Sequence, residues 1–80
     1  MDRFPALGLA RRAGEVGGTL PAVFNAANEI AVEAFCNQSI TFDQIPQLVA
    51  RVMKEHEVVA DPTLEQILGA DAWARKSAVR

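Results

Sequence analysis

The sequence predicts an all-α protein, a small antiparallel bundle of about four main helices joined by short loops. Apolar residues recur at three- and four-residue intervals through much of the chain, which is the spacing of one side of an α-helix. Glycines and an Asp-Pro step interrupt these runs, whereas strand patterns are almost absent. With 80 residues, 50% of them hydrophobic and 22% charged, the chain is expected to form one domain over residues 1–80.

The first predicted helix runs from Pro5 to about Glu15. Proline suits the first position of a helix, where its missing N–H is not needed. Gly17 and Gly18 are expected to end the helix. Its apolar residues are spread widely around the axis and it contains two glycines, so packing rather than intrinsic propensity is expected to hold it.

The second predicted helix begins at Leu20, with Thr19 as its predicted N-cap and Pro21 in its first turn, and continues to about Phe35. One side is apolar and is expected to face the core, with Leu20, Val23, Phe24, Ala27, Ile30, Ala31, Ala34 and Phe35.

The other side of this helix mixes polar and apolar residues: Asn25, Asn28, Glu29 and Glu33, with Val32 and Cys36 among them. A helix side that faces only water seldom places valine and cysteine within its polar residues. Both sides of the helix are therefore expected to contact protein.

The third predicted helix follows a turn at residues 37–39. Thr41 and Gln44 have the spacing of a capping box, but a helix that starts there would lose a hydrogen bond at Pro46. Capping at Asp43 avoids this loss and is the start we favour. The apolar residues that follow recur at i, i+3, i+4, i+7 and i+8, namely Ile45, Leu48, Val49, Val52 and Met53.

A further helical stretch follows the break at Asp61-Pro62. Thr63 and Gln66 have the spacing of a capping box, and Gly69 is expected to stop the stretch. Its short apolar side consists of Leu64, Ile67 and Leu68.

The last helix is expected to span Ala72 to Val79, with Asp71 as its N-cap. Trp73 is its expected anchor in the core, because a single tryptophan in a small domain is most often a core residue.

Charge and composition exclude several classes of function. The net charge is −2, and no Lys or Arg occurs between Arg12 and Arg51, so the basic stripe of a nucleic-acid-binding protein is missing. No apolar stretch approaches the length of a membrane span. Cys36 is the single cysteine, which rules out an internal disulfide and fits a cytoplasmic location.

Four segments, in order along the chain, carry motifs of one family. Residues 19–35, TLPAVFNAANEIAVEAF, contain the Asn-Ala-Ala-Asn-Glu sequence that is the most specific of them. The others are residues 3–10 with their Phe-Pro start, residues 40–46, and residues 64–75. Together they resemble the C-terminal domain of 1-deoxy-D-xylulose 5-phosphate reductoisomerase, with residues 19–35 as its signature helix.

The resemblance implies a role within a larger enzyme. That enzyme rearranges 1-deoxy-D-xylulose 5-phosphate and reduces the product with NADPH to 2-C-methyl-D-erythritol 4-phosphate, in the non-mevalonate route to isoprenoids. It requires Mg or Mn and is a homodimer, with NADPH on a Rossmann-type domain and the metal ligands on a central catalytic domain. None of those motifs occurs here, so no catalytic, cofactor-binding or metal residue is assigned, and the isolated chain is expected to be inactive.

By this resemblance, the partner of the domain is the catalytic domain of the same polypeptide. The residues expected at that interface lie on the mixed side of the second helix: Asn25, Asn28, Glu29, Val32 and Cys36.

Two other functions stay open. The chain could be a free-standing helical module that binds another protein in a groove. It could also be a small enzyme or metal protein built on Glu29, Glu33 and His56, although a metal site in a bundle needs ligands that converge from several helices. His56 itself is expected to be an ordinary surface histidine at the end of the third helix.

Overall fold

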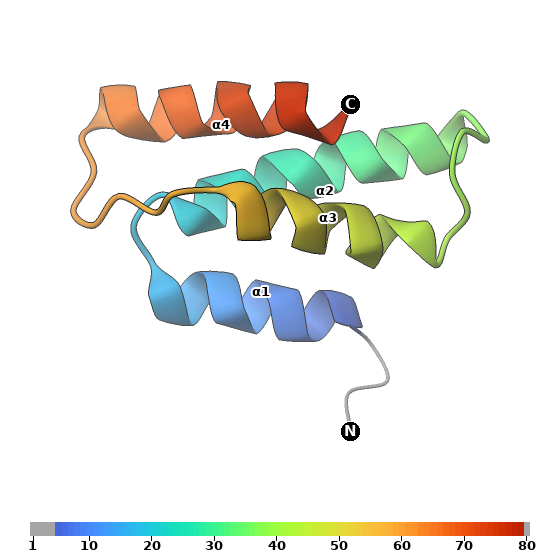
Figure 1. The fold of residues 1–80 in the computed structure, drawn as a ribbon, viewed down its shortest axis with the longest axis horizontal. Coiled ribbons are helices and arrows are strands. Elements are labelled where there is room, and N and C mark those ends of the chain that lie inside the picture. Colours follow the sequence, from blue (N-terminus) through green and yellow to red (C-terminus); the bar gives the residue numbers. More distant parts are fainter. Residues whose placement is uncertain (1–4, 80) are drawn as a thin grey trace.

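Four helices follow one another in alternating directions in the computed structural model, which describes residues 5–79 (Figure 1). They are α1 (Pro5–Val16), α2 (Leu20–Cys36), α3 (Gln44–Glu55) and α4 (Leu64–Ala78). No strand occurs in the described part, and the predicted all-α antiparallel bundle is confirmed. The first two residues of the Arg3–Ala10 motif lie outside the described residues.

Helix α2 is the element around which the other three are arranged. It contacts α1, α3 and α4, whereas α1 and α4 do not contact each other (Figure 1). The domain is correspondingly flat, with principal extents of 35 × 29 × 16 Å. The core is built largely on the side of α2 that faces the other helices, with Leu20, Val23, Ala26, Ala27 and Ala31 buried.

The predicted apolar side of α2 is right along most of its length but wrong at its end. Ala26, which was not predicted to lie in the core, is fully buried. Phe35, expected in the core, is 40% exposed, and its ring instead meets Phe42 in an edge-to-face contact with centroids 5.7 Å apart. The last turn of α2 therefore packs on the loop toward α3.

Three residues connect α1 to α2. Gly17 and Gly18 have φ angles of 71° and 59°, in the left-handed region that suits glycine, and they end α1 as predicted. Thr19 occupies the N-cap position, but its side chain makes no capping hydrogen bond, which corrects the prediction. The hydroxyl is used in a tertiary contact instead.

That contact, the Thr19 clasp, joins the start of α2 to the segment after α3 through Thr19, His56 and Val59. Thr19 donates its N–H to the Val59 carbonyl at 3.1 Å, and its hydroxyl oxygen accepts from the Val59 N–H at 3.0 Å. The same oxygen lies 2.7 Å from Nε2 of His56. Thr19 is fully buried, so the clasp satisfies its polar groups where water cannot.

His56 is therefore not the plain surface residue that the sequence predicted. Its side chain is half-buried, and its ring lies against that of Trp73 on α4, with centroids 5.2 Å apart. Trp73 is partly buried and packs against the core, as expected of an anchor. Burial lowers the pKa of His56, an effect partly opposed by the carboxylate of Glu57.

Helix α3 follows the sequence pattern closely. Ile45, Val49, Val52 and Met53 are buried, and Leu48 packs against them partly buried. Asp43 is at the N-cap position, as favoured, but its side chain makes no capping bond. The backbone N–H of Thr41 instead donates to the side chain of Gln44 at 2.8 Å. This is one of the two hydrogen bonds of the Thr41–Gln44 capping box, the alternative start of the helix.

Helix α4 is one continuous helix, which corrects the prediction of two shorter ones. The capping box of Thr63 and Gln66 is confirmed at its start, but Gly69 does not stop it, and Asp71 lies inside it. A single glycine costs a helix only about 1 kcal/mol, and burial of neighbouring alanines against α2 offsets that cost. Leu64 and Leu68, the predicted apolar side, are 71% and 60% exposed.

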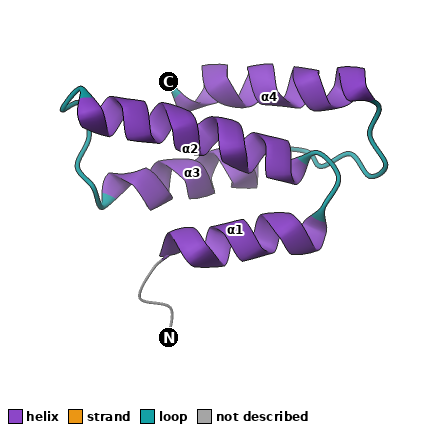
Figure 2. Ribbon diagram, turned by 180° about the vertical axis from the view of Figure 1, so that it is seen from behind, coloured by secondary structure: helices purple, strands orange, loops and turns teal. Residues whose placement is uncertain are grey.

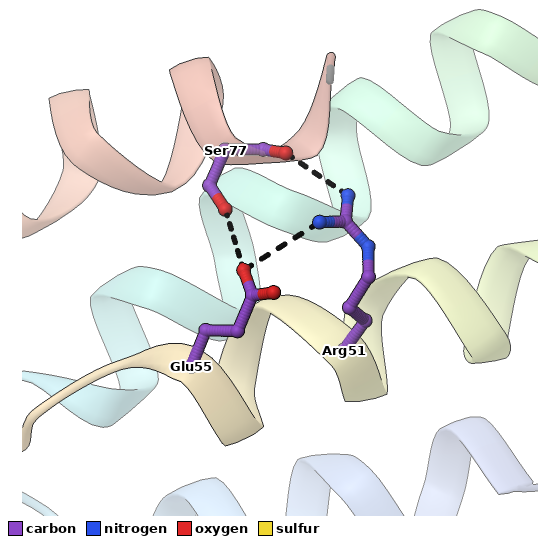
Figure 3. A network of polar contacts seen from close by, with 3 residues as sticks. All are labelled: Arg51, Glu55 and Ser77. Atoms are coloured by element: carbon purple, nitrogen blue, oxygen red, sulfur yellow. Dashed lines mark hydrogen bonds and ion pairs between the residues drawn. The ribbon is translucent and has the colours of Figure 1, made fainter.

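A polar network fixes the C-terminal end of α4 to α3 (Figure 3). Arg51 donates to the backbone carbonyl of Ser77 at 2.9 Å, and the Ser77 hydroxyl donates to the Glu55 carboxylate at 3.2 Å. Arg51 and Glu55 also form an i, i+4 ion pair at 3.5 Å. A cation placed at the carbonyl end of α4 is favoured by the helix dipole.

Replacing each of the two linker glycines by alanine is expected to show how much stability is lost through backbone strain and how much through a steric clash. Gly17→Ala should cost about 1–2 kcal/mol, because it strains only the left-handed backbone. Gly18→Ala should cost about 1–3 kcal/mol more, because its Cβ would overlap the carbonyl oxygen of Val59 in the clasp. Urea unfolding of the two variants followed by circular dichroism measures the difference, and equal losses would contradict it.

The clasp is also expected to make stability depend on pH. Neutral His56 can accept the Thr19 hydroxyl proton at Nε2, whereas an imidazolium cannot. Because the pKa of His56 is lowered from 6.5, its contribution is fully present above about pH 6.5 and is lost as the pH falls through the lower folded pKa. The free energy of unfolding should therefore fall below pH 6.5 in this window, and His56→Gln should flatten that part of the profile. A profile that His56→Gln leaves unchanged would contradict this assignment.

Candidate domain interface on helix α2

The side of α2 that points away from the other helices carries a stripe of exposed residues. Asn25, Val32 and Cys36, spaced by seven and four residues, lie along one line of the helix, and we name them the α2 outer stripe. All three are exposed, and Val32 is 42% exposed. Seen from behind, α2 lies in front of α3, with no other helix in front of it (Figure 2).

The two other predicted interface residues lie at the edges of this stripe. Asn28 is half-buried. Glu29 is exposed but forms an ion pair with Arg75 of α4 at 2.7 Å, and Arg75 also pairs with Asp71 at 2.6 Å. The pKa of Arg75 is raised by its hydrogen bonds to Asp71 and then to Glu29. Glu29 therefore already has a partner inside the domain.

Sequence reasoning missed an aromatic extension of this surface. Phe42, in the loop after α2, is 71% exposed and contacts the half-exposed ring of Phe35. Phe42 stands alone between polar residues, Thr41 and Asp43, which is the only signal that the sequence offers. Two exposed aromatic rings at the end of an exposed helix side add apolar area of the kind found at protein contacts.

The residues considered for catalysis or metal binding are not brought together. Glu29 forms an ion pair with Arg75, whereas His56 contacts Thr19 in the clasp. Within residues 5–79, no three His, Cys, Asp or Glu side chains are grouped so that they could hold a metal ion. The described residues thus offer amides, a valine, a thiol and aromatic rings, which is the chemistry of a protein contact.

The helices of the described part are also unlike membrane spans, since none of them has both the length and the apolar character that a bilayer crossing requires.

Comparison with known proteins places the chain in one family. The family model described as "DXP reductoisomerase C-terminal domain" matches residues 1–77. The 1-deoxy-D-xylulose 5-phosphate reductoisomerase of Halothermothrix orenii is 55% identical over 76 residues, covering 95% of this chain and 20% of the relative. The enzyme of the same name from a Synechococcus species is 57% identical over 74 residues, covering 92% of this chain and 19% of the relative.

A solved structure agrees with this placement. The 1-deoxy-D-xylulose 5-phosphate reductoisomerase from Zymomonas mobilis in complex with NADPH superposes with a TM-score of 0.88 and 42% identity, over 96% of this chain and 20% of that one. The chain thus spans about one fifth of the length of the relatives that it matches. It belongs to the family of DXP reductoisomerase C-terminal domains.

Proposed function

We propose that this chain is the helical supporting domain of a 1-deoxy-D-xylulose 5-phosphate reductoisomerase and docks onto the catalytic domain of the same polypeptide. The parent enzyme converts 1-deoxy-D-xylulose 5-phosphate to 2-C-methyl-D-erythritol 4-phosphate with NADPH. Family membership is the ground for this activity of the parent. The chain corresponds to only about one fifth of the length of its relatives, which favours a supporting role for the domain.

The observation that carries the proposal is the asymmetry of α2. One side of the helix is fully buried, with Val23 and Ala27 at 0% exposure, while Val32 on the opposite side is 42% exposed. A valine within a line of polar residues gains little from facing water, and its burial against a second surface is favourable in free energy. Asn25 beside it has an amide that can bind backbone groups of that surface.

The other parts of the enzyme's chemistry are assigned to the rest of the polypeptide. The described residues contain no grouped ligands that fit a divalent metal. By the family resemblance, the other domains would hold Mg or Mn and NADPH. We further propose that the parent is a cytoplasmic homodimer; the single cysteine of this chain fits that location.

A free-standing helical interaction module is the second candidate, favoured by the same exposed side of α2. The reading frame around this chain separates the two: an upstream Rossmann domain and a carboxylate-bearing central domain support the enzyme, and their absence supports the module.

The isolated 80-residue chain is expected to have no reductoisomerase activity. The reason is that the residues grouped on its described surface have the chemistry of a protein contact and not of catalysis. The measurement is NADPH oxidation in the presence of 1-deoxy-D-xylulose 5-phosphate and Mg²⁺, with the full-length enzyme as the positive control. Turnover by the isolated chain would refute the supporting role.

Val32→Arg tests the docking side directly. In the isolated chain it should change the free energy of unfolding by less than about 0.5 kcal/mol, because the side chain is at the surface. In the full-length enzyme it should destabilise by about 2 kcal/mol or more, because a charge would be buried without a partner. Thermal unfolding of both proteins measures the effect.

Leu64→Arg is the matched control, because Leu64 is 71% exposed on α4 and does not belong to the α2 outer stripe. It should have little effect in either protein. If Val32→Arg is equally harmless in the full-length enzyme, the α2 outer stripe is not the docking side.

A further inference from the structure

A groove lies between α1 and α3. Its volume is about 390 Å³, and we name it the α1–α3 groove. Met53 lines it and is 7% exposed, while Val16 of α1 and Val58 after α3 line it and are 46% and 39% exposed. Apolar walls of this kind, left open in a folded domain, favour a ligand or partner that covers them.

The charges of the groove narrow the choice of occupant. Arg12 of α1 and Lys54 of α3 line it together with His56 and the apolar residues, and none of the described residues that line it is acidic. Ion pairs in residues 5–79 use Arg51 and Arg75, so neither cation of the groove belongs to one. The groove therefore carries positive charge, although the net charge of the chain is −2. Its charge is complementary to that of an anionic partner.

The source of such a partner follows from the length of the chain. The relatives that it matches are about five times longer, which leaves some four fifths of the polypeptide to supply a segment for the groove. A covalently attached segment also has a high effective concentration, so it outcompetes a free partner of similar affinity.

We propose that the α1–α3 groove is a second docking site, occupied by a segment of the same polypeptide outside residues 1–80. The segment places apolar side chains on Val16, Met53 and Val58, and one or more carboxylates beside Arg12 and Lys54. This rests on the proposed function, since it requires the chain to be one domain of a longer enzyme. The domain is then held at two places, the α2 outer stripe and the groove.

Chemical labelling of the full-length enzyme tests the two contacts separately. The chain has two lysines, Lys54 in the groove and Lys76 on α4, and the single cysteine, Cys36, on the outer stripe. Lysines are acylated and the cysteine alkylated in the native and in the urea-denatured enzyme, and each site is followed by peptide mass spectrometry. Lys76 reports on the general reactivity of an exposed lysine.

Lys54 is expected to react at least about tenfold more slowly in the native enzyme than in the denatured one, as for a segment bound with about 1.4 kcal/mol or more. A native rate equal to the denatured rate overturns the groove proposal. If Cys36 is protected in that experiment while Lys54 is not, the proposed function stands and the second docking site falls. If Cys36 reacts freely, the docking of α2 falls instead.

Neighbouring arginines provide a matched pair of variants. Arg12→Gln should raise the native labelling rate of Lys54 severalfold, because the segment loses one cationic partner. Arg11→Gln should not, because Arg11 is exposed on α1 but does not line the groove. If the two variants change the labelling rate of Lys54 equally, the segment does not carry the proposed carboxylates. If the protection of Lys54 is lost when the enzyme is diluted, the groove is occupied by a second copy of the enzyme and the proposal is overturned.

Discussion

Close packing of three helices on one side of α2 is the constraint on which the rest of the structure depends. Val23, Ala26, Ala27 and Ala31 have no exposed surface, and three of the four are alanines. Small side chains let α3 and α4 approach the axis of α2 closely, at the cost of less apolar area per residue. Because α2 serves all three neighbours on this side, its opposite side is left free for contacts outside the domain.

The parts of the fold that could be predicted from the sequence are those set by local interactions. The periodicity of α3 and the capping box at Thr63 involve residues within one or two turns, so the sequence shows them directly. The continuity of α4 through Gly69 could not be predicted, because it depends on the burial of Ala70 and Ala74 against another helix. Thr19 likewise has the type of an N-cap, but its partners lie 37 and 40 residues away.

The candidate interface was predictable to a similar degree. The mixed composition of one helix side identified Asn25, Val32 and Cys36 as exposed residues, and their common orientation follows from helical geometry alone. The ion pair of Glu29 with Arg75 depends on where α4 crosses α2, which no local pattern encodes. The groove between α1 and α3 is a product of tertiary packing for the same reason.

The Thr19 clasp ties together one part of the domain and leaves helix α1 outside it. Because it joins the start of α2 to the segment after α3, the chain from residue 19 to residue 59 forms a ring closed by hydrogen bonds, with Trp73 of α4 resting on it through His56. Helix α1 lies outside that ring and touches only α2 and α3. A local opening of α1 would therefore leave the hydrogen bonds of the ring intact.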